Sequence, residues 1–162
     1  MRYRNVILVA FSLDRPSVSD AGTVYFPSDE FPFTRVYEPR NRSSKMAPAG
    51  KTSLVAETPC DSGENMWKAD DTEVIATTRR GLERVGWLNT GEDCEAVVRR
   101  LPYAYPVLET GYSQKIESLR TRLSQFENLR FSGRSGRFVY SWLHEMLRFG
   151  KDIVAETAHS EH

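Results

Sequence analysis

The distribution of hydrophobic residues along the chain predicts short β-strands in its first hundred positions. A continuous, β-branched apolar run at residues 6–11 is typical of a strand that is buried on both faces. Shorter apolar runs bounded by prolines and polar residues predict further strands at residues 23–26, 33–37, 53–58 and 95–101. Strands of this spacing that begin or end at prolines favour an antiparallel sheet with loops of moderate length.

Hydrophobic residues at helical spacing predict two helices, one before and one after the strand at 95–101. The first is capped by Asp70 or Asp71 and ends at Gly86. Its apolar face is formed by Val74, Ile75, Leu82 and Val85. The second is capped by Ser113, and its apolar face is formed by Ile116, Leu119, Leu123 and Phe126.

A last short strand at residues 129–132 is followed by a third amphipathic segment from about Ser141 onward. Its apolar positions are Leu143, Met146, Leu147, Ile153 and Val154. Together these elements predict an α+β fold, with a mixed, mainly antiparallel sheet and about three helices. We expect a sheet and one helix in residues 1–110, a helix–strand–helix segment in residues 111–157 and a frayed tail at 158–162.

Size and charge narrow the class of protein. With 162 residues and 40% hydrophobic content, the chain can bury a core and is expected to form a single compact unit. Its 22 basic and 22 acidic residues give no net charge, which argues against a nucleic-acid-binding protein that relies on a global positive field. The longest apolar runs fall well short of the roughly 20 residues that span a bilayer, so no membrane span is expected.

Cysteine and histidine positions give no sign of a disulfide or a metal site. Cys60 and Cys94 have no CxxC spacing and are predicted to be free thiols in a cytoplasmic protein. His144, His159 and His162 lack the spacing of metal ligands, and we expect no metal.

The most suggestive local pattern is a glycine loop between the strand at 129–132 and the helix that follows. Glycine allows positive φ and a close approach of the backbone to a ligand, which suits Gly133 and Gly136 to a phosphate or pyrophosphate group. Arg134 and Arg137 add bidentate donors for the same kind of group. A plain structural turn between strand and helix is the alternative.

Three stretches of the chain resemble one family in the order in which the family carries them. Gly133-Arg134-Ser135-Gly136, followed by Phe138, Tyr140 and Gly150, is similar to the carboxy-terminal flavin-binding segment of FAD-dependent amine-oxidase-like oxidoreductases. That group includes protoporphyrinogen-oxidase-like and UDP-galactopyranose-mutase-like proteins. The stretch at residues 35–57, which contains Arg35-Val36-Tyr37-Glu38-Pro39-Arg40-Asn41, and the stretch at 101–112 resemble the same family.

The resemblance implies FAD as cofactor and hydride transfer to the flavin, with the cofactor carrying the chemistry. It places cofactor contacts at Gly133, Arg134, Gly136, Phe138 and Tyr140, and substrate-side residues at Arg35, Tyr103 and Tyr105. Packing is the alternative role for these aromatic residues, and an exposed structural arginine is the alternative for Arg35. Catalytic residues and the small-molecule substrate stay unknown.

The sequence departs from the family at its beginning. The strand at 6–11 runs into Ser12-Leu13-Asp14-Arg15-Pro16, and the chain contains no GxGxxG after a strand, the element that grips the pyrophosphate of FAD. We therefore expect a substrate-domain-like carboxy-terminal part of such an oxidoreductase, inactive alone. Its expected partner is the missing amino-terminal FAD-binding half, or a second copy of itself through an unpartnered sheet edge. A stand-alone, non-catalytic binding or interaction module derived from the family is the alternative.

Overall fold

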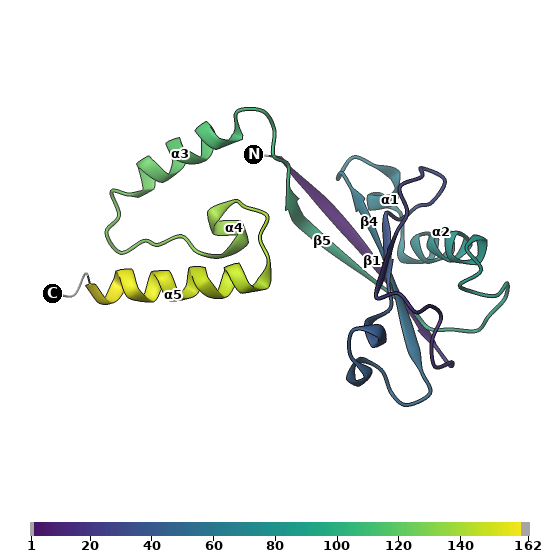
Figure 1. Ribbon diagram of the computed structural model, residues 1–162. Helices are drawn as coiled ribbons and strands as arrows, with labels where there is room; N and C mark the ends of the chain where they lie inside the picture. The colour runs from purple at the N-terminus through teal and green to yellow at the C-terminus, as the bar shows by residue number, and fades with distance from the viewer. Residues whose placement is uncertain (1, 160–162) are drawn as a thin grey trace. The chain divides into compact units, whose positions relative to one another are not determined.

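A computed structural model describes residues 2–159, which contain five strands, five α-helices and two short 3-10 helices (Figure 1). The strands are β1 (Tyr3–Leu13), β2 (Thr23–Tyr25), β3 (Arg35–Tyr37), β4 (Thr52–Cys60) and β5 (Ala96–Pro106). The α-helices are α1 (Asn65–Lys68), α2 (Asp71–Arg84), α3 (Tyr112–Leu123), α4 (Gly133–Arg137) and α5 (Leu143–His159). The 3-10 helices are η1 (Pro39–Asn41) and η2 (Ser44–Met46). The α+β fold class is confirmed, and α1 and α4 are short additions to the three expected helices.

By their contacts, the residues form two compact units. Tyr3–Tyr105 makes up the sheet unit, and the chain from Pro106 onward, together with Arg2, makes up the helical unit. Of the tail expected at 158–162, the first two residues belong to α5, and residues 160–162 lie outside the described residues. Within the described residues, no helix is both long and apolar enough to cross a membrane.

The sheet is antiparallel and has the strand order β2-β3-β4-β1-β5. The predicted strand at 6–11 lies inside β1, which pairs with β4 over its whole length from Asn5↔Cys60 to Leu13↔Thr52. The expected strand at 95–101 is longer than its pattern indicated and continues through Pro102 to Pro106. Because β5 is an edge strand, its prolines remove few ladder hydrogen bonds, and the strand tolerates them.

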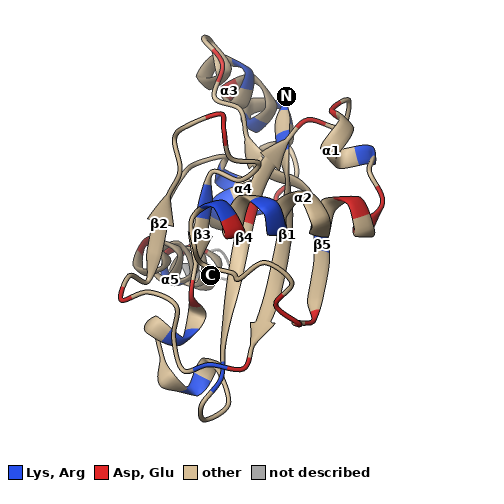
Figure 2. Ribbon diagram, turned by 90° about the vertical axis from the view of Figure 1, so that its right-hand side faces the viewer, with Lys and Arg blue, Asp and Glu red and all other residues tan. Residues whose placement is uncertain are grey.

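One face of the sheet is covered by α1 and α2 (Figures 1 and 2). Alternate residues of the strands pack there against Val74 and Leu82 of α2, both fully buried. The strand residues of this core include Ile7, Val9, Phe11, Val36, Leu54, Ala56 and Val98. Burying an aliphatic side chain of this size stabilises the fold by about 1.5–3 kcal/mol. The helix therefore fixes which strand residues point inward and which point to the opposite face.

The ends of α2 follow the sequence prediction. Asp70 is the N-cap, and its Oδ1 accepts a hydrogen bond of 2.8 Å from the backbone N–H of Glu73. Gly86 follows the helix with φ +76°, a left-handed conformation that glycine adopts without strain. Inside the helix, Gly81 allows a close approach: a Cβ at this position would lie 2.7 Å from Cε1 of Phe33.

A buried carboxylate organises the loops at one end of the sheet. Glu38 is almost fully buried, and its two oxygens accept hydrogen bonds from the backbone N–H groups of Val18 and Ser19. The Thr52 hydroxyl donates to Oε1 at 2.6 Å, and Nδ2 of Asn41 donates to Oε2 at 3.2 Å. The stretch around Glu38 that resembles the family thus has a structural role as the tie between two loops and β4.

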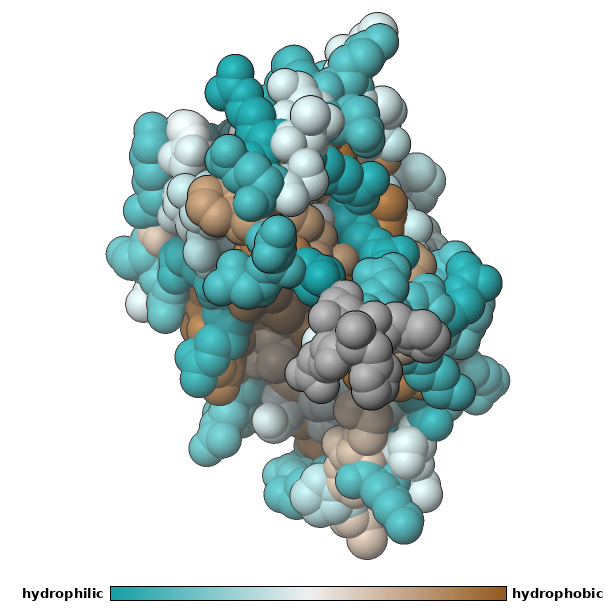
Figure 3. Space-filling model, turned by 90° about the vertical axis from the view of Figure 1, so that its left-hand side faces the viewer, coloured by the Kyte–Doolittle hydropathy of each residue, from teal (hydrophilic) through white to brown (hydrophobic). Residues whose placement is uncertain are grey.

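The helical unit buries little of its hydrophobic surface. Phe138 is buried, whereas Leu119, Phe126, Leu129, Trp142, Leu143, Leu147 and Val154 are exposed. On the face shown in Figure 3, hydrophobic side chains (brown) are exposed among mainly hydrophilic ones (teal). Exposed apolar surface of this kind is typical of a region that contacts another molecule or another part of a protein.

Two predictions for this unit are wrong. Residues 129–132 form no strand, because all described strands belong to the sheet unit and an isolated strand has no neighbour to pair its N–H and C=O groups. Ser113 does not cap α3, which begins one residue earlier at Tyr112. Gly111 holds the N-cap position instead, in a left-handed conformation with φ +81°.

Candidate functional site

A row of side chains crosses the face of the sheet opposite α2. Arg35 pairs directly with Tyr25 of β2 on one side and with Glu57 of β4 on the other. Their neighbours in sequence, Val36 and Ala56, belong to the core. Since side chains alternate along a strand, Arg35 and Glu57 project together from the other face.

Glu57 is the centre of this row. Its side chain is 8% exposed, and its Oε2 accepts hydrogen bonds from both Nε (3.1 Å) and Nη2 of Arg35. Its other oxygen, Oε1, accepts a hydrogen bond of 2.9 Å from the hydroxyl of Tyr105 on β5. A buried carboxylate needs such partners, because burying it without compensation is costly.

The surroundings of Arg35 stabilise the charged form of its guanidinium. Partial burial disfavours the charged guanidinium, but the hydrogen bonds to Glu57 and Tyr25 and the attraction of the Glu57 carboxylate outweigh it, so the pKa of Arg35 lies above its ordinary value. Burial, followed by the negative charge of Glu57, also raises the pKa of Tyr37 above its ordinary value. The guanidinium of Arg42 lies over the Tyr37 ring, 4.9 Å from its centroid.

This arrangement is suited to positioning rather than to covalent chemistry. The positive charge of Arg35 is balanced by Glu57, so the site presents no net charge. It offers the guanidinium N–H groups that Glu57 does not accept and the acceptor oxygen of the Tyr105 hydroxyl. Tyr105 is fixed in place by the same carboxylate. Preorganised polar groups of this kind orient a polar substrate without further rearrangement.

The structure brings two of the three expected substrate-side residues together and leaves the third apart. Arg35 and Tyr105 meet through Glu57. Tyr103, two residues before Tyr105, has φ +56° and a ring that packs edge-on against Tyr3, with centroids 5.7 Å apart. Its backbone N–H donates to Oδ1 of Asn5 at 3.1 Å, and 74% of its surface is exposed.

The glycine loop has a different geometry from the one its sequence predicted. Gly133 begins a helix of only five residues, α4, and the long helix α5 starts at Leu143. Gly133 has φ +71° and open space where a Cβ would stand, whereas a Cβ on Gly136 would come within 3.8 Å of the backbone of Phe131. The backbone of Gly133 is therefore open to a close neighbour, and Gly136 is in ordinary van der Waals contact with Phe131.

The two aromatic residues after this loop have different surroundings. Phe138 is buried and ends α4 with φ +54°, and the packing role considered for it fits this position. Tyr140 is half exposed, and its hydroxyl donates a hydrogen bond of 2.6 Å to the carbonyl of Pro106. The guanidinium of Arg134 lies over the Tyr140 ring, 4.9 Å from its centroid.

The loop offers two features that a flavin dinucleotide, the cofactor implied by the resemblance, would use. The open backbone at Gly133 admits a close ligand, and the stacked pair Arg134 and Tyr140 offers a cation and a flat ring beside it. A five-residue helix adds little dipole, so the loop alone does not supply the anion binding that a long helix would.

Sequence reasoning did not single out Glu57, Tyr37, Tyr25 or Arg42 as site residues. Glu57 belongs to the stretch that resembles the family, but an acidic residue in a strand is unremarkable until its register is known. The signal that identifies it is the pairing of β3 with β4, which sets Glu57 opposite Arg35. That pairing follows from tertiary structure and not from spacing.

The fold defines a class before any individual protein is compared: an antiparallel five-stranded sheet with helices on one face and a helical extension after its last strand. Among solved structures, the chain is similar to a reduced UDP-galactopyranose mutase, with a TM-score of 0.70 and 23% sequence identity over 84% of this chain. It is also similar to a putative protoporphyrinogen oxidase from Exiguobacterium sp. 255-15, with a TM-score of 0.62 and 14% identity over 82% of this chain.

The chain spans only 29% and 30% of the length of these two proteins. No family model and no curated protein matches the sequence. At these identities the likeness establishes the fold, which agrees with the expected resemblance to a partial domain of such proteins.

Proposed function

We propose that this chain is the carboxy-terminal part of an FAD-dependent oxidoreductase that acts by hydride transfer between a small-molecule substrate and flavin. The observation that carries the proposal is the shared fold over more than four fifths of the chain with two proteins of the flavin-dependent class. Because these residues correspond to less than a third of each, the proposed activity also requires a dinucleotide-binding part that they do not include.

In this proposal the sheet unit provides the substrate side. Arg35 orients a polar group of the substrate through the guanidinium N–H groups that Glu57 does not accept. The Tyr105 hydroxyl, whose proton is donated to Glu57, offers its oxygen as an acceptor to the same substrate. Tyr103 adds an exposed ring at the end of the same strand. The chain's own residues therefore position the substrate, while bound FAD supplies the hydride acceptor.

The helical unit provides part of the cofactor contact. Gly133 offers its backbone, and Arg134 and Tyr140 offer a charge and a ring. Gly136 and Phe138 shape the turn between them. The remaining grip on the pyrophosphate comes from the missing half.

FAD binding tests the proposal. The purified chain is titrated with FAD by calorimetry, alone and after mixing with an amino-terminal segment of a UDP-galactopyranose-mutase-like protein that contains the GxGxxG unit. We expect weak or no binding to the chain alone and retained, stoichiometric flavin in the mixture. A Gly133→Val variant, which fills the open approach, is expected to reduce flavin retention. Gly91→Val, which places valine at a similar positive φ in open space, controls for backbone strain and should leave retention unchanged.

The outcomes separate this proposal from its alternative. If the chain alone binds FAD stoichiometrically, the dependence on a missing half is wrong. If no combination retains flavin although both parts are folded, the chain is better described as a non-catalytic binding module with the fold of these enzymes.

A further inference from the structure

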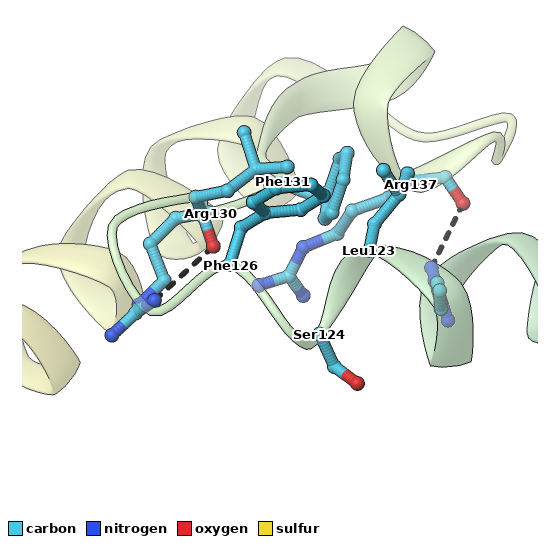
Figure 4. A pocket seen from close by; sticks show the side chains of 8 residues that line it. Leu123, Ser124, Phe126, Arg130, Phe131 and Arg137 are labelled. Carbon is cyan, nitrogen blue, oxygen red and sulfur yellow. Dashed lines mark hydrogen bonds between the residues drawn. The ribbon is translucent and has the colours of Figure 1, made fainter.

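The helical unit contains a pocket of about 390 Å³ formed by the end of α3, the loop after it and α4 (Figure 4). Its walls carry Arg120, Arg130 and Arg137 together with Leu123, Phe126 and Phe131. Arg137 was expected to donate to a phosphate at the glycine loop, whereas Gly133, Arg134, Gly136, Phe138 and Tyr140 do not line this pocket. A volume of this size lies within the range of roughly 300–1,000 Å³ that is usual for small-molecule sites.

The three arginines bring uncompensated charge to this pocket. Arg120 donates from Nη2 to the carbonyl of Arg137 at 3.1 Å, and Arg130 donates from Nη1 to the carbonyls of Glu127 and Leu129. Arg137 lies over the Phe149 ring, 4.1 Å from its centroid. Within the described part of the chain, none of the three pairs with a carboxylate.

Three arginines that line one pocket give it a positive local potential, which favours an anion. Each guanidinium has five N–H donors in a planar fork, and the hydrogen bonds made here use only part of them. This geometry suits the oxygens of a phosphate group, which takes bidentate donors well. A phosphate monoester, with its charge of about −1.5 to −2 at pH 7, matches several cations better than a single carboxylate does.

The remaining walls are apolar and aromatic. In Figure 4 the guanidinium of Arg137 lies in the middle of the group, with Arg130 on the left and Leu123 on the right. Phe126 is 49% exposed, so its ring is accessible. A flat apolar group stacked here would remove ring surface from water and would also lie beside the guanidinium planes.

We propose that this pocket binds a small phosphate monoester whose phosphate is joined to a flat apolar group. The three arginines hold the phosphate, and Phe126, Phe131 and Leu123 hold the apolar part. The proposal shares one residue, Arg137, with the anion site expected at the glycine loop, and otherwise uses other residues and another kind of phosphate group.

Binding of 1-naphthyl phosphate to the full chain, measured by calorimetry, tests this site. Inorganic phosphate, which lacks the ring, and 1-naphthol, which lacks the charge, serve as comparison ligands. We expect the aryl phosphate to bind at least about tenfold more tightly than either one, since it alone uses both halves of the pocket.

Variants locate the binding. Arg137→Gln is expected to weaken 1-naphthyl phosphate about tenfold, and Phe126→Ala is expected to weaken it while leaving inorganic phosphate unchanged. Arg122→Gln, on the same helix as Arg120 but outside this pocket, is the matched control and should have little effect. Because Phe126 is exposed, its variant stays informative even if Arg137→Gln unfolds.

Two results would overturn the proposal. One is no binding of 1-naphthyl phosphate above the level of inorganic phosphate by a folded chain. The other is equal weakening by Arg122→Gln and Arg137→Gln, which would mean that the anion responds only to overall charge. Neither result bears on whether FAD binds in the presence of a dinucleotide-binding partner.

Discussion

Arg35 and Glu57 face each other across β3 and β4 and form an ion pair in which one carboxylate oxygen receives two hydrogen bonds from one guanidinium. The carboxylate is nearly buried, while the guanidinium is partly exposed. Glu57 is therefore as poorly solvated as a member of a buried ion pair. Removing Arg35 would leave the Glu57 carboxylate charged, nearly buried and without its cationic partner.

We expect Arg35→Met to lower the free energy of unfolding by about 2 kcal/mol, because Glu57 loses its charged partner. The double variant Arg35→Met with Glu57→Met should recover most of that loss, since no buried charge remains. Urea denaturation of the two single variants and the double variant gives the coupling energy directly. Additive effects in this cycle would mean that the pair contributes no interaction of its own. Arg80→Gln, at an exposed position of α2, is the control.

A second prediction concerns Tyr37, whose pKa is raised from its ordinary value of 10.0 by burial and by Glu57. A raised pKa in the folded state means that the protonated phenol stabilises the fold below the ordinary value and that this contribution is lost as pH rises past it. The unfolding free energy should therefore decrease between about pH 9 and about pH 11, and this decrease should be smaller in Tyr37→Phe than in the unaltered chain. An equal fall in both proteins would contradict the assignment to Tyr37.

A third prediction concerns Glu38, the buried carboxylate that accepts hydrogen bonds from four groups, in the loop after β1, in η1 and in β4. Glu38→Gln places an amide N–H₂ where the surrounding groups are donors, so at least one of them loses its acceptor. We expect a loss of about 2–3 kcal/mol in unfolding free energy, measured by urea denaturation. Glu83→Gln, on α2 and without a hydrogen bond through its side chain among those described, should change stability by less than about 0.5 kcal/mol.

The fourth prediction compares two helical glycines. A Cβ at Gly81 would lie 2.7 Å from the Phe33 ring and 2.9 Å from Cδ of Pro32, so Gly81→Ala should destabilise the chain by about 1–3 kcal/mol through overpacking. Gly150 in α5 has no atom within 4 Å of its Cβ position, and Gly150→Ala should stabilise that helix by up to about 1 kcal/mol. Thermal unfolding followed by circular dichroism measures both. Effects of the same sign would show that packing at Gly81 does not decide the outcome.

The helix α2 is an element that local sequence patterns were sufficient to predict. Its N-cap at Asp70, its apolar residues Val74 and Leu82 and its terminating glycine at Gly86 were all predictable, because capping and periodicity depend on residues a few positions apart. The strand at 6–11 was predictable for a similar reason, since its β-branched apolar run has few alternatives to a buried strand.

The strand expected at 129–132 is an element for which local sequence patterns were not sufficient. Its apolar pattern fits a strand, but strand formation also needs a neighbouring strand, and the described residues offer none to this segment. For the same reason, the strand–loop–helix arrangement expected around Gly133 became a short helix in a loop, even though the glycine itself adopts the expected positive φ.

The sequence by itself determined the α+β class, the positions of most strands and of α2, α3 and α5, and the resemblance to proteins with this fold, because these features depend on local patterns and on ordered motifs. Only the tertiary structure decided that Arg35, Glu57 and Tyr105 meet, that Tyr103 packs against Tyr3, and that three arginines line one pocket. Those relationships depend on strand register and on contacts between residues far apart in the chain, and a shift of one residue in register would place Glu57 on the opposite face.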